Sequence, residues 1–260
     1  MGPKATGVRT RASGMLGRLG WLLPILVVVG CGASTLPAIH SEPERLAVAR
    51  QMMARREWNI AIELLKGYIS ANAGSADVDE AIERLGECYL AKKDWPSAAV
   101  EFERLLRDYP ESDSSGTASF RLGEALFGQA RPRDFDQEYT HKALEQWQSY
   151  LRSFPGHWLN AEAERKIVVT RRRLALKLLD TARLYLKLKF LSPARIYYER
   201  VAQEYADTGL ESDALLGVAM CDAKAGKKAE AIEGFKVVEE RFAGQPIAAR
   251  AAHERSRLER

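Results

Sequence analysis

A small residue stands at the centre of the same helical pattern five times along the chain. Apolar residues recur around each copy at spacings of three and four, which place them on one face of an α-helix. The copies lie 37, 45, 51 and 37 residues apart, at Ala61, Ala98, Ala143, Ala194 and Ala231. A nearly constant period of this length is typical of repeat proteins, in which each unit buries its apolar face against the next. The sequence therefore predicts an all-α stack of about five helix pairs, with a generic amphipathic helical bundle as the alternative.

The clearest unit runs from Asp79 to Ser112 and has 34 residues. It resembles a tetratricopeptide repeat, whose characteristic positions are filled by Leu85, Gly86, Tyr89, Trp95, Ala98, Phe102, Leu105, Tyr109 and Pro110. We expect Gly86 and Ala98 to lie where two antiparallel helices cross closely, because a large side chain would push the helices apart. Pro110 ends the second helix. The resemblance implies a right-handed solenoid over residues 45–260, with the first helices of the pairs lining a concave groove.

Irregular spacing between the units predicts where extra residues are inserted. A charged loop is expected at Ala130 to Tyr139, between the two helices of the third unit. An amphipathic helical stretch is expected at Asn160 to Leu176, leading into the fourth unit. The last segment, Ala248 to Arg260, contains no proline or glycine, so we expect a polar helix that caps the open end of the stack.

The N-terminus has the order of a bacterial targeting segment. Residues 1–18 are basic without acids, residues 19–29 are apolar, and Gly30 and Cys31 follow. An apolar run of this length is too short to span a bilayer, and the order is that of a secretory signal peptide. The ending resembles a lipobox, which implies cleavage before Cys31 and a lipid attached to its thiol. An ordinary signal peptide with a chance cysteine, or a short anchor, is the alternative. Residues 31–44 are expected to form a flexible tether.

The charge balance excludes one class of partner. The chain has 39 Lys and Arg against 35 Asp and Glu, and the surplus of four lies entirely within residues 1–30. The remainder is neutral overall, so the composition gives no support to a nucleic-acid surface. Phosphate loops and the common hydrolase and zinc-protease motifs are absent, and the four histidines have no metal-ligand spacing. We therefore expect no enzyme activity and no cofactor or metal, apart from the lipid on Cys31.

The two other cysteines occupy equivalent positions in two units. Cys88 and Cys221 both lie ten residues into the first helix of a repeat. We expect small, buried, reduced side chains at these positions, too far apart to form a disulfide.

The complete pattern resembles the BamD (YfiO) outer-membrane assembly lipoprotein family. The resemblance rests on the turn Asp94-Trp95-Pro96-Ser97-Ala98 and on the inserted segment with Arg133-Asp134 and Asp136-Gln137. It also rests on Phe154-Pro155, on the long helix with Leu174-Ala175, and on the end Tyr205-Ala206-Asp207-Thr208. Two positions depart from the family pattern: Ala206 replaces a proline, and Tyr197 stands where an arginine that binds the barrel subunit is usual.

The resemblance implies a lipid-anchored scaffold on the periplasmic face of the outer membrane. It would act in the machine that folds and inserts β-barrel proteins, with a BamA-like barrel subunit and unfolded outer-membrane protein precursors as partners. A paralogue with another partner remains an alternative, as does another periplasmic repeat protein that coordinates cell-envelope assembly or division.

Repeat register predicts which side chains enter the N-terminal half of the groove. Peptide-binding candidates combine apolar anchors with charges, namely Arg50, Met53, Glu83, Glu87, Leu90, Phe120, Glu124 and Phe127. Such anchors are where the binding energy of interfaces concentrates. Register does not decide between groove and core for Phe120 and Phe127, which could instead be buried against the next helix.

Overall fold

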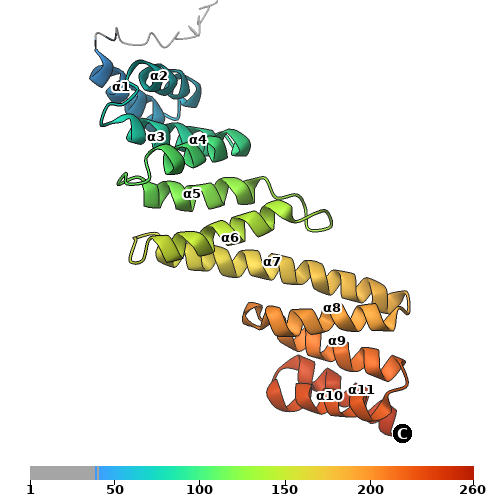
Figure 1. The fold of residues 1–260 in the computed structure, drawn as a ribbon. Coiled ribbons are helices and arrows are strands. Elements are labelled where there is room, and N and C mark those ends of the chain that lie inside the picture. The colour runs from blue at the N-terminus through green and yellow to red at the C-terminus, as the bar shows by residue number, and fades with distance from the viewer. Residues whose placement is uncertain (1–38, 40) are drawn as a thin grey trace, which may run out of the picture. The chain divides into compact units, whose positions relative to one another are not determined.

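Every regular element in the described part of the chain is helical. The computed structural model describes Ile39 and residues 41–260, and the predicted signal peptide, Cys31 and most of the tether lie outside these residues. The elements are α1 (Glu42–Ala54), α2 (Trp58–Ala71), α3 (Val78–Ala91), α4 (Trp95–Asp108), α5 (Ser115–Gly128), α6 (Glu138–Ser153), α7 (Asn160–Lys187), α8 (Leu191–Glu204), the short 3-10 helix η1 (Ala206–Thr208), α9 (Glu211–Lys224), α10 (Lys228–Arg241) and α11 (Pro246–Glu259) (Figure 1). Residues 41–260 therefore form an all-α fold, as predicted.

The helices stack in chain order. Within residues 41–260, α1 to α10 form five consecutive helix pairs, and each pair packs on the next. Helix α11 packs on α10. The small residues that define the repeat are all fully buried, at Ala61, Ala98, Ala143, Ala194 and Ala231. The predicted solenoid of about five helix pairs is confirmed, and its core is a series of apolar layers between successive helices.

Glycines on one helix accommodate aromatic rings from the neighbouring helix. A Cβ atom on Gly86 would lie 2.6 Å from the Phe102 ring, and one on Gly123 would lie 2.4 Å from Nε1 of Trp147. The predicted close crossing at Gly86 is therefore correct, and its physical cause is the ring of Phe102. The same arrangement recurs where Gly217 of α9 faces the Tyr198 ring of α8.

The first helix begins earlier than the sequence suggested. Helix α1 starts at Glu42, whereas the flexible tether was expected to extend to Glu44. The reason is local capping, because the Ser41 hydroxyl accepts a hydrogen bond from the backbone N–H of Glu44 at 3.3 Å. Pro43 lies in the first turn, where its missing N–H has no cost.

The extra segment before the fourth unit is part of one long helix. Helix α7 has 28 residues and joins the predicted stretch at Asn160 to Leu176 directly to the first helix of that unit. The predicted terminal helix is α11, of which only Ala251 is fully buried. None of the helices between Ser41 and Arg260 has the length and apolar character needed to cross a membrane.

The inserted loop between α5 and α6 is fastened to α7. Arg173 donates to the side-chain oxygen of Gln137 at 3.0 Å and to the backbone carbonyl of Arg131. Lys177 donates to the carbonyl of Asp134 at 2.7 Å. The amide of Gln137 points back into the loop and donates to several of its carbonyls. The loop spans residues 129–137, since Glu138 and Tyr139 already belong to α6.

The two described cysteines are buried and free, as expected. Burial raises the pKa of the Cys88 thiol to about 12 and that of the Cys221 thiol to about 11. Both side chains therefore remain neutral thiols and act as small apolar groups in the core.

Candidate functional site

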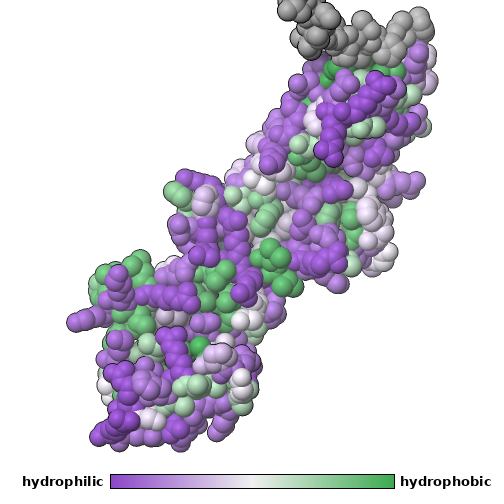
Figure 2. All heavy atoms as spheres, turned by 180° about the vertical axis from the view of Figure 1, so that it is seen from behind, coloured by the Kyte–Doolittle hydropathy of each residue, from purple (hydrophilic) through white to green (hydrophobic). Residues whose placement is uncertain are grey.

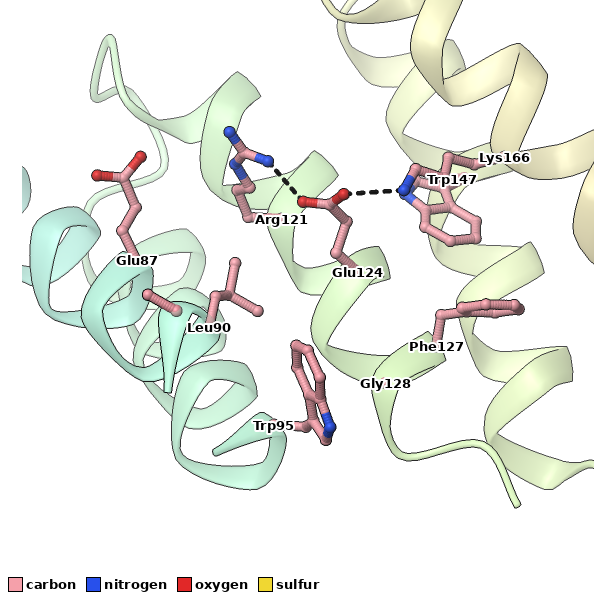
Figure 3. Close-up of a pocket in the computed structure, with 10 residues that line it drawn as sticks. Glu87, Leu90, Trp95, Arg121, Glu124, Phe127, Gly128, Trp147 and Lys166 are labelled. Carbon is pink, nitrogen blue, oxygen red and sulfur yellow. Dashed lines mark hydrogen bonds and ion pairs between the residues drawn. The ribbon is translucent and has the colours of Figure 1, made fainter. Parts of the chain in front are cut away.

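Helices α3, α5 and α7 line a cavity in the N-terminal half of the solenoid. Its volume is about 600 Å³, which lies within the range of small-molecule and side-chain binding pockets. Its lining combines aromatic, aliphatic and charged side chains, namely Glu87, Leu90, Ala91, Trp95, Arg121, Glu124, Phe127, Gly128, Trp147 and Lys166. Figure 3 shows Leu90 and Trp95 on one side of α5 and Phe127 and Trp147 on the other.

The apolar part of the cavity depends on a glycine, Gly128, at the end of α5. Trp95 begins α4, and its half-buried indole lies against Gly128 at the end of α5. A Cβ atom on Gly128 would lie only 2.3 Å from the indole, so any larger residue would displace the ring. Trp147 of α6 forms a fixed wall, because it is fully buried and its Nε1 donates to the carbonyl of Phe120 at 3.1 Å. Phe127 packs against this wall with a ring separation of 5.8 Å.

A chain of ion pairs crosses the polar part of the cavity. Glu124 accepts from Nη1 of Arg121 at 2.6 Å and from Nζ of Lys166 at 3.0 Å (Figure 3). One carboxylate thus lies between two cations, and Lys166 also lies 4.0 Å from a carboxylate oxygen of Glu162. The Nε atom of Arg121 is buried and has no hydrogen-bond partner. Glu87 on α3 is held by Arg84 at 2.9 Å. The N–H groups of Arg121 and Lys166 can therefore donate hydrogen bonds to a carboxylate or carbonyl oxygen of an incoming chain.

Four of the predicted groove residues meet in this cavity. Glu87 and Leu90 come from α3, and Glu124 and Phe127 come from α5. Two others lie elsewhere in the first units. Arg50 is exposed and pairs with Glu80 at 2.6 Å, and Met53 packs half-buried against the N-terminal core.

The expectation that Phe120 lines the groove is wrong. Phe120 is only 1% exposed, and its ring lies 5.8 Å from that of Tyr150 and 6.5 Å from that of Trp147. It belongs to the core between α5 and α6, which was the alternative that repeat register left open. Phe127, further along the same helix, is only half-buried and reaches the cavity.

Glu83 is likewise not a groove residue. Its side chain is buried, and its carboxylate accepts a hydrogen bond from the Ser114 hydroxyl at 2.6 Å. Burial raises the pKa of Glu83, while this hydrogen bond opposes the shift. Glu83 therefore ties α3 to the segment before α5 and has no free face for a ligand.

Three important lining residues escaped the sequence reasoning. Trp95 was assigned to a characteristic position of the repeat and to its turn, but not to the groove. Arg121 was not among the groove candidates. A signal for Arg121 was its spacing of three from Glu124, which places opposite charges side by side on a helix. Lys166 comes from the inserted half of α7, so only the stacking of the helices places it beside α5.

The described residues contain no group of three His, Cys, Asp or Glu side chains arranged to hold a metal ion. The cavity is thus built from aromatic rings, aliphatic side chains and ion pairs. Its chemistry is that of a binding pocket for a side chain or a short chain segment.

Comparison with known proteins places the chain in a family. The model of the family described as "YfiO: Outer membrane lipoprotein" matches residues 41–237. No curated protein matches the chain. Among solved structures, a thermophilic TPR protein from Thermus thermophilus is 19% identical over 82% of this chain and 98% of its own, with a TM-score of 0.38. A TPR repeats protein from Bacteroides fragilis is 12% identical over 85% and 96%, with a TM-score of 0.43. The family match covers most of the chain, and the protein therefore belongs to the YfiO family of outer-membrane lipoproteins.

Proposed function

We propose that this protein is a lipid-anchored scaffold on the periplasmic face of the outer membrane. It serves the machine that folds and inserts β-barrel proteins, and it is attached through acylated Cys31. Membership of the YfiO family supports the outer-membrane assignment. The observation that carries the binding role is the cavity between α3, α5 and α7, which joins an aromatic pocket to a row of charges.

The cavity suits a segment of an unfolded barrel precursor. Trp95, Phe127 and Leu90 offer contact surface to one large apolar side chain. Arg121 and Lys166 lie beside it and can bind a carboxylate or backbone oxygen of the same segment. An extended chain with an aromatic residue next to an acidic or terminal carboxyl group would therefore satisfy both parts of the cavity.

The cavity is tested by cross-linking to C-terminal peptides of barrel proteins. We expect Trp95→Ala with Phe127→Ala to lose most cross-links, since aromatic anchors supply much of the binding energy at such sites. The matched control is Phe135→Ala, which removes a ring that is 48% exposed on the inserted loop. Circular dichroism must show the helical content of the wild type for both proteins. Unchanged cross-linking by the folded double variant would remove this cavity as the precursor site.

The partner and the anchor are tested on the protein isolated from its own membrane. Intact mass should show a chain that begins at Cys31 and carries lipid, and Cys31→Ser should abolish the modification. Affinity capture followed by mass spectrometry should recover a BamA-like barrel subunit. Capture of cell-division or envelope proteins without a barrel subunit would instead favour a different periplasmic interaction protein.

A further inference from the structure

A second cavity lies in the C-terminal half of the solenoid, between α7, α9 and α11. Its volume is about 410 Å³. It shares no residue with the first cavity, and its lining is formed by Arg183, Leu186, Lys187, Lys189, Tyr198, Asp213, Leu216, Gly217, Met220, Lys224 and Arg250. On the face of the molecule that Figure 2 presents, apolar patches are separated by strongly hydrophilic surface.

The lining is strongly basic. Five cations surround the cavity and only one carboxylate, that of Asp213, lies among them. Asp213 pairs with Arg183 at 3.6 Å, and Arg183 also pairs with Asp180 at 3.3 Å. Within the part of the chain that the structure describes, the other four cations form no ion pair; they are Lys187, Lys189, Lys224 and Arg250. Like charges brought together without partners cost free energy, which an anionic ligand would recover.

The floor between these cations is apolar. Leu216 is buried, and Leu186 and Met220 are half-buried beside it. The Tyr198 ring packs directly on the backbone of α9 at Gly217, where a Cβ atom would lie 2.4 Å from it, and it closes the bottom of the floor as a buried residue. The flexible Met220 side chain can adapt to apolar groups of different shapes. A ligand that fits this cavity therefore carries apolar groups between its negative charges.

The placement of the cations selects the class of ligand. They come from the end of α7, from the turn after it, from the end of α9 and from α11. A single phosphate group binds best where several donors converge on one point, as in a nest of backbone N–H groups. Charges distributed along several helices instead match carboxylates placed at intervals along an extended chain. We propose that this basic cavity binds an acidic, extended segment of a partner protein, with an apolar side chain of that segment on the floor.

The test measures binding of a fluorescein-labelled peptide of alternating Asp, Glu and Leu to the full chain in detergent. Lys187→Gln with Lys224→Gln removes two unpaired cations and keeps the length of both side chains close to that of lysine. The matched control is Lys228→Gln with Lys236→Gln, which removes two exposed lysines of α10 outside the cavity. We expect about tenfold weaker binding for the first variant and little change for the control, because each exposed ion pair contributes modestly. Binding should also weaken at about 0.5 M salt.

Three results would overturn the proposal. The wild type could fail to bind the acidic peptide, or the two double variants could bind it with equal affinity. In the third, the wild type binds phosphatidylglycerol vesicles or inorganic phosphate more strongly than the peptide, and the cavity variant abolishes that binding. The last result would assign the cavity to phosphate groups. Trp95→Ala must leave this binding intact, since the two cavities share no residue. Failure of the basic cavity is therefore distinguishable from failure of the precursor site.

Discussion

Gly123→Ala adds one methyl group at the tightest helix crossing of the third unit. The new Cβ would lie 2.4 Å from Nε1 of Trp147 and 2.7 Å from two further atoms of the same ring. The indole cannot move freely, because it is fully buried and bonded to the carbonyl of Phe120. The substitution therefore forces either the ring or the backbone of α5 to shift.

The expected magnitude follows from three opposing contributions. Alanine in place of glycine favours a helix interior by about 1 kcal/mol. Overpacking a filled core costs typically about 1–3 kcal/mol, and weakening the buried hydrogen bond of Trp147 costs roughly 1 kcal/mol more. The net result is a loss of about 2 kcal/mol, which for a chain of this size lowers the melting temperature by roughly 4–8 °C.

The matched control is Gly67→Ala, which makes the same change in the interior of α2. Its Cβ would meet only the Arg45 side chain, with the guanidinium nitrogen at 3.0 Å, and a flexible side chain can move aside. This variant should be stabilised by up to about 1 kcal/mol through helix propensity alone. Thermal unfolding followed by circular dichroism compares the two proteins. A Gly123→Ala variant as stable as Gly67→Ala would refute the argument that the Trp147 ring sets the helix separation.

Three further outcomes test the core and the inserted loop. Cys88 and Cys221 should react with iodoacetamide at pH 8 only after unfolding, because burial raises both thiol pKa values to about 12 and about 11; rapid labelling of the native chain would contradict this packing. Ala98→Phe should destabilise the protein by about 1–3 kcal/mol in urea unfolding, whereas Val100→Phe, at a side chain that is 60% exposed, should have little effect. Arg173→Ala should release the loop between α5 and α6 from α7, so trypsin should cleave that loop several-fold faster; an unchanged rate would show that Arg173 does not fasten it.

The sequence predicted those features that depend on contacts within one helix pair. Ala98 and Gly86 mark a close crossing because their small size is visible in the sequence and their partner lies in the same unit. Phe120 and Phe127 show where this reasoning stops. Both contact the Trp147 ring of α6, but Phe120 lies in the middle of α5 and also meets Tyr150, whereas Phe127 lies next to the last residue of α5 and reaches the cavity. Which of them is exposed depends on how neighbouring helices are displaced along their axes.

Contacts between units were less predictable for the same reason. Lys166 reaches Glu124 only because α7 is longer than a normal repeat helix and extends past α5. The burial of Glu83 depends on Ser114, a residue in the segment that enters the next unit. Neither relation leaves a periodic signal, because each joins an ordinary surface residue to a partner in another repeat.

Helix α7 sets the distance between the two cavities. Its Lys166 belongs to the first and its Lys187 to the second, within one uninterrupted helix. These residues are 21 positions apart in the sequence, which in a straight α-helix is about 32 Å. An extended chain covers about 3.3–3.6 Å per residue, so one strand needs roughly nine or ten residues to reach both cavities at once. A chain with its aromatic and acidic parts at that separation would bind with the avidity of two linked sites, whereas a shorter one would occupy either cavity alone.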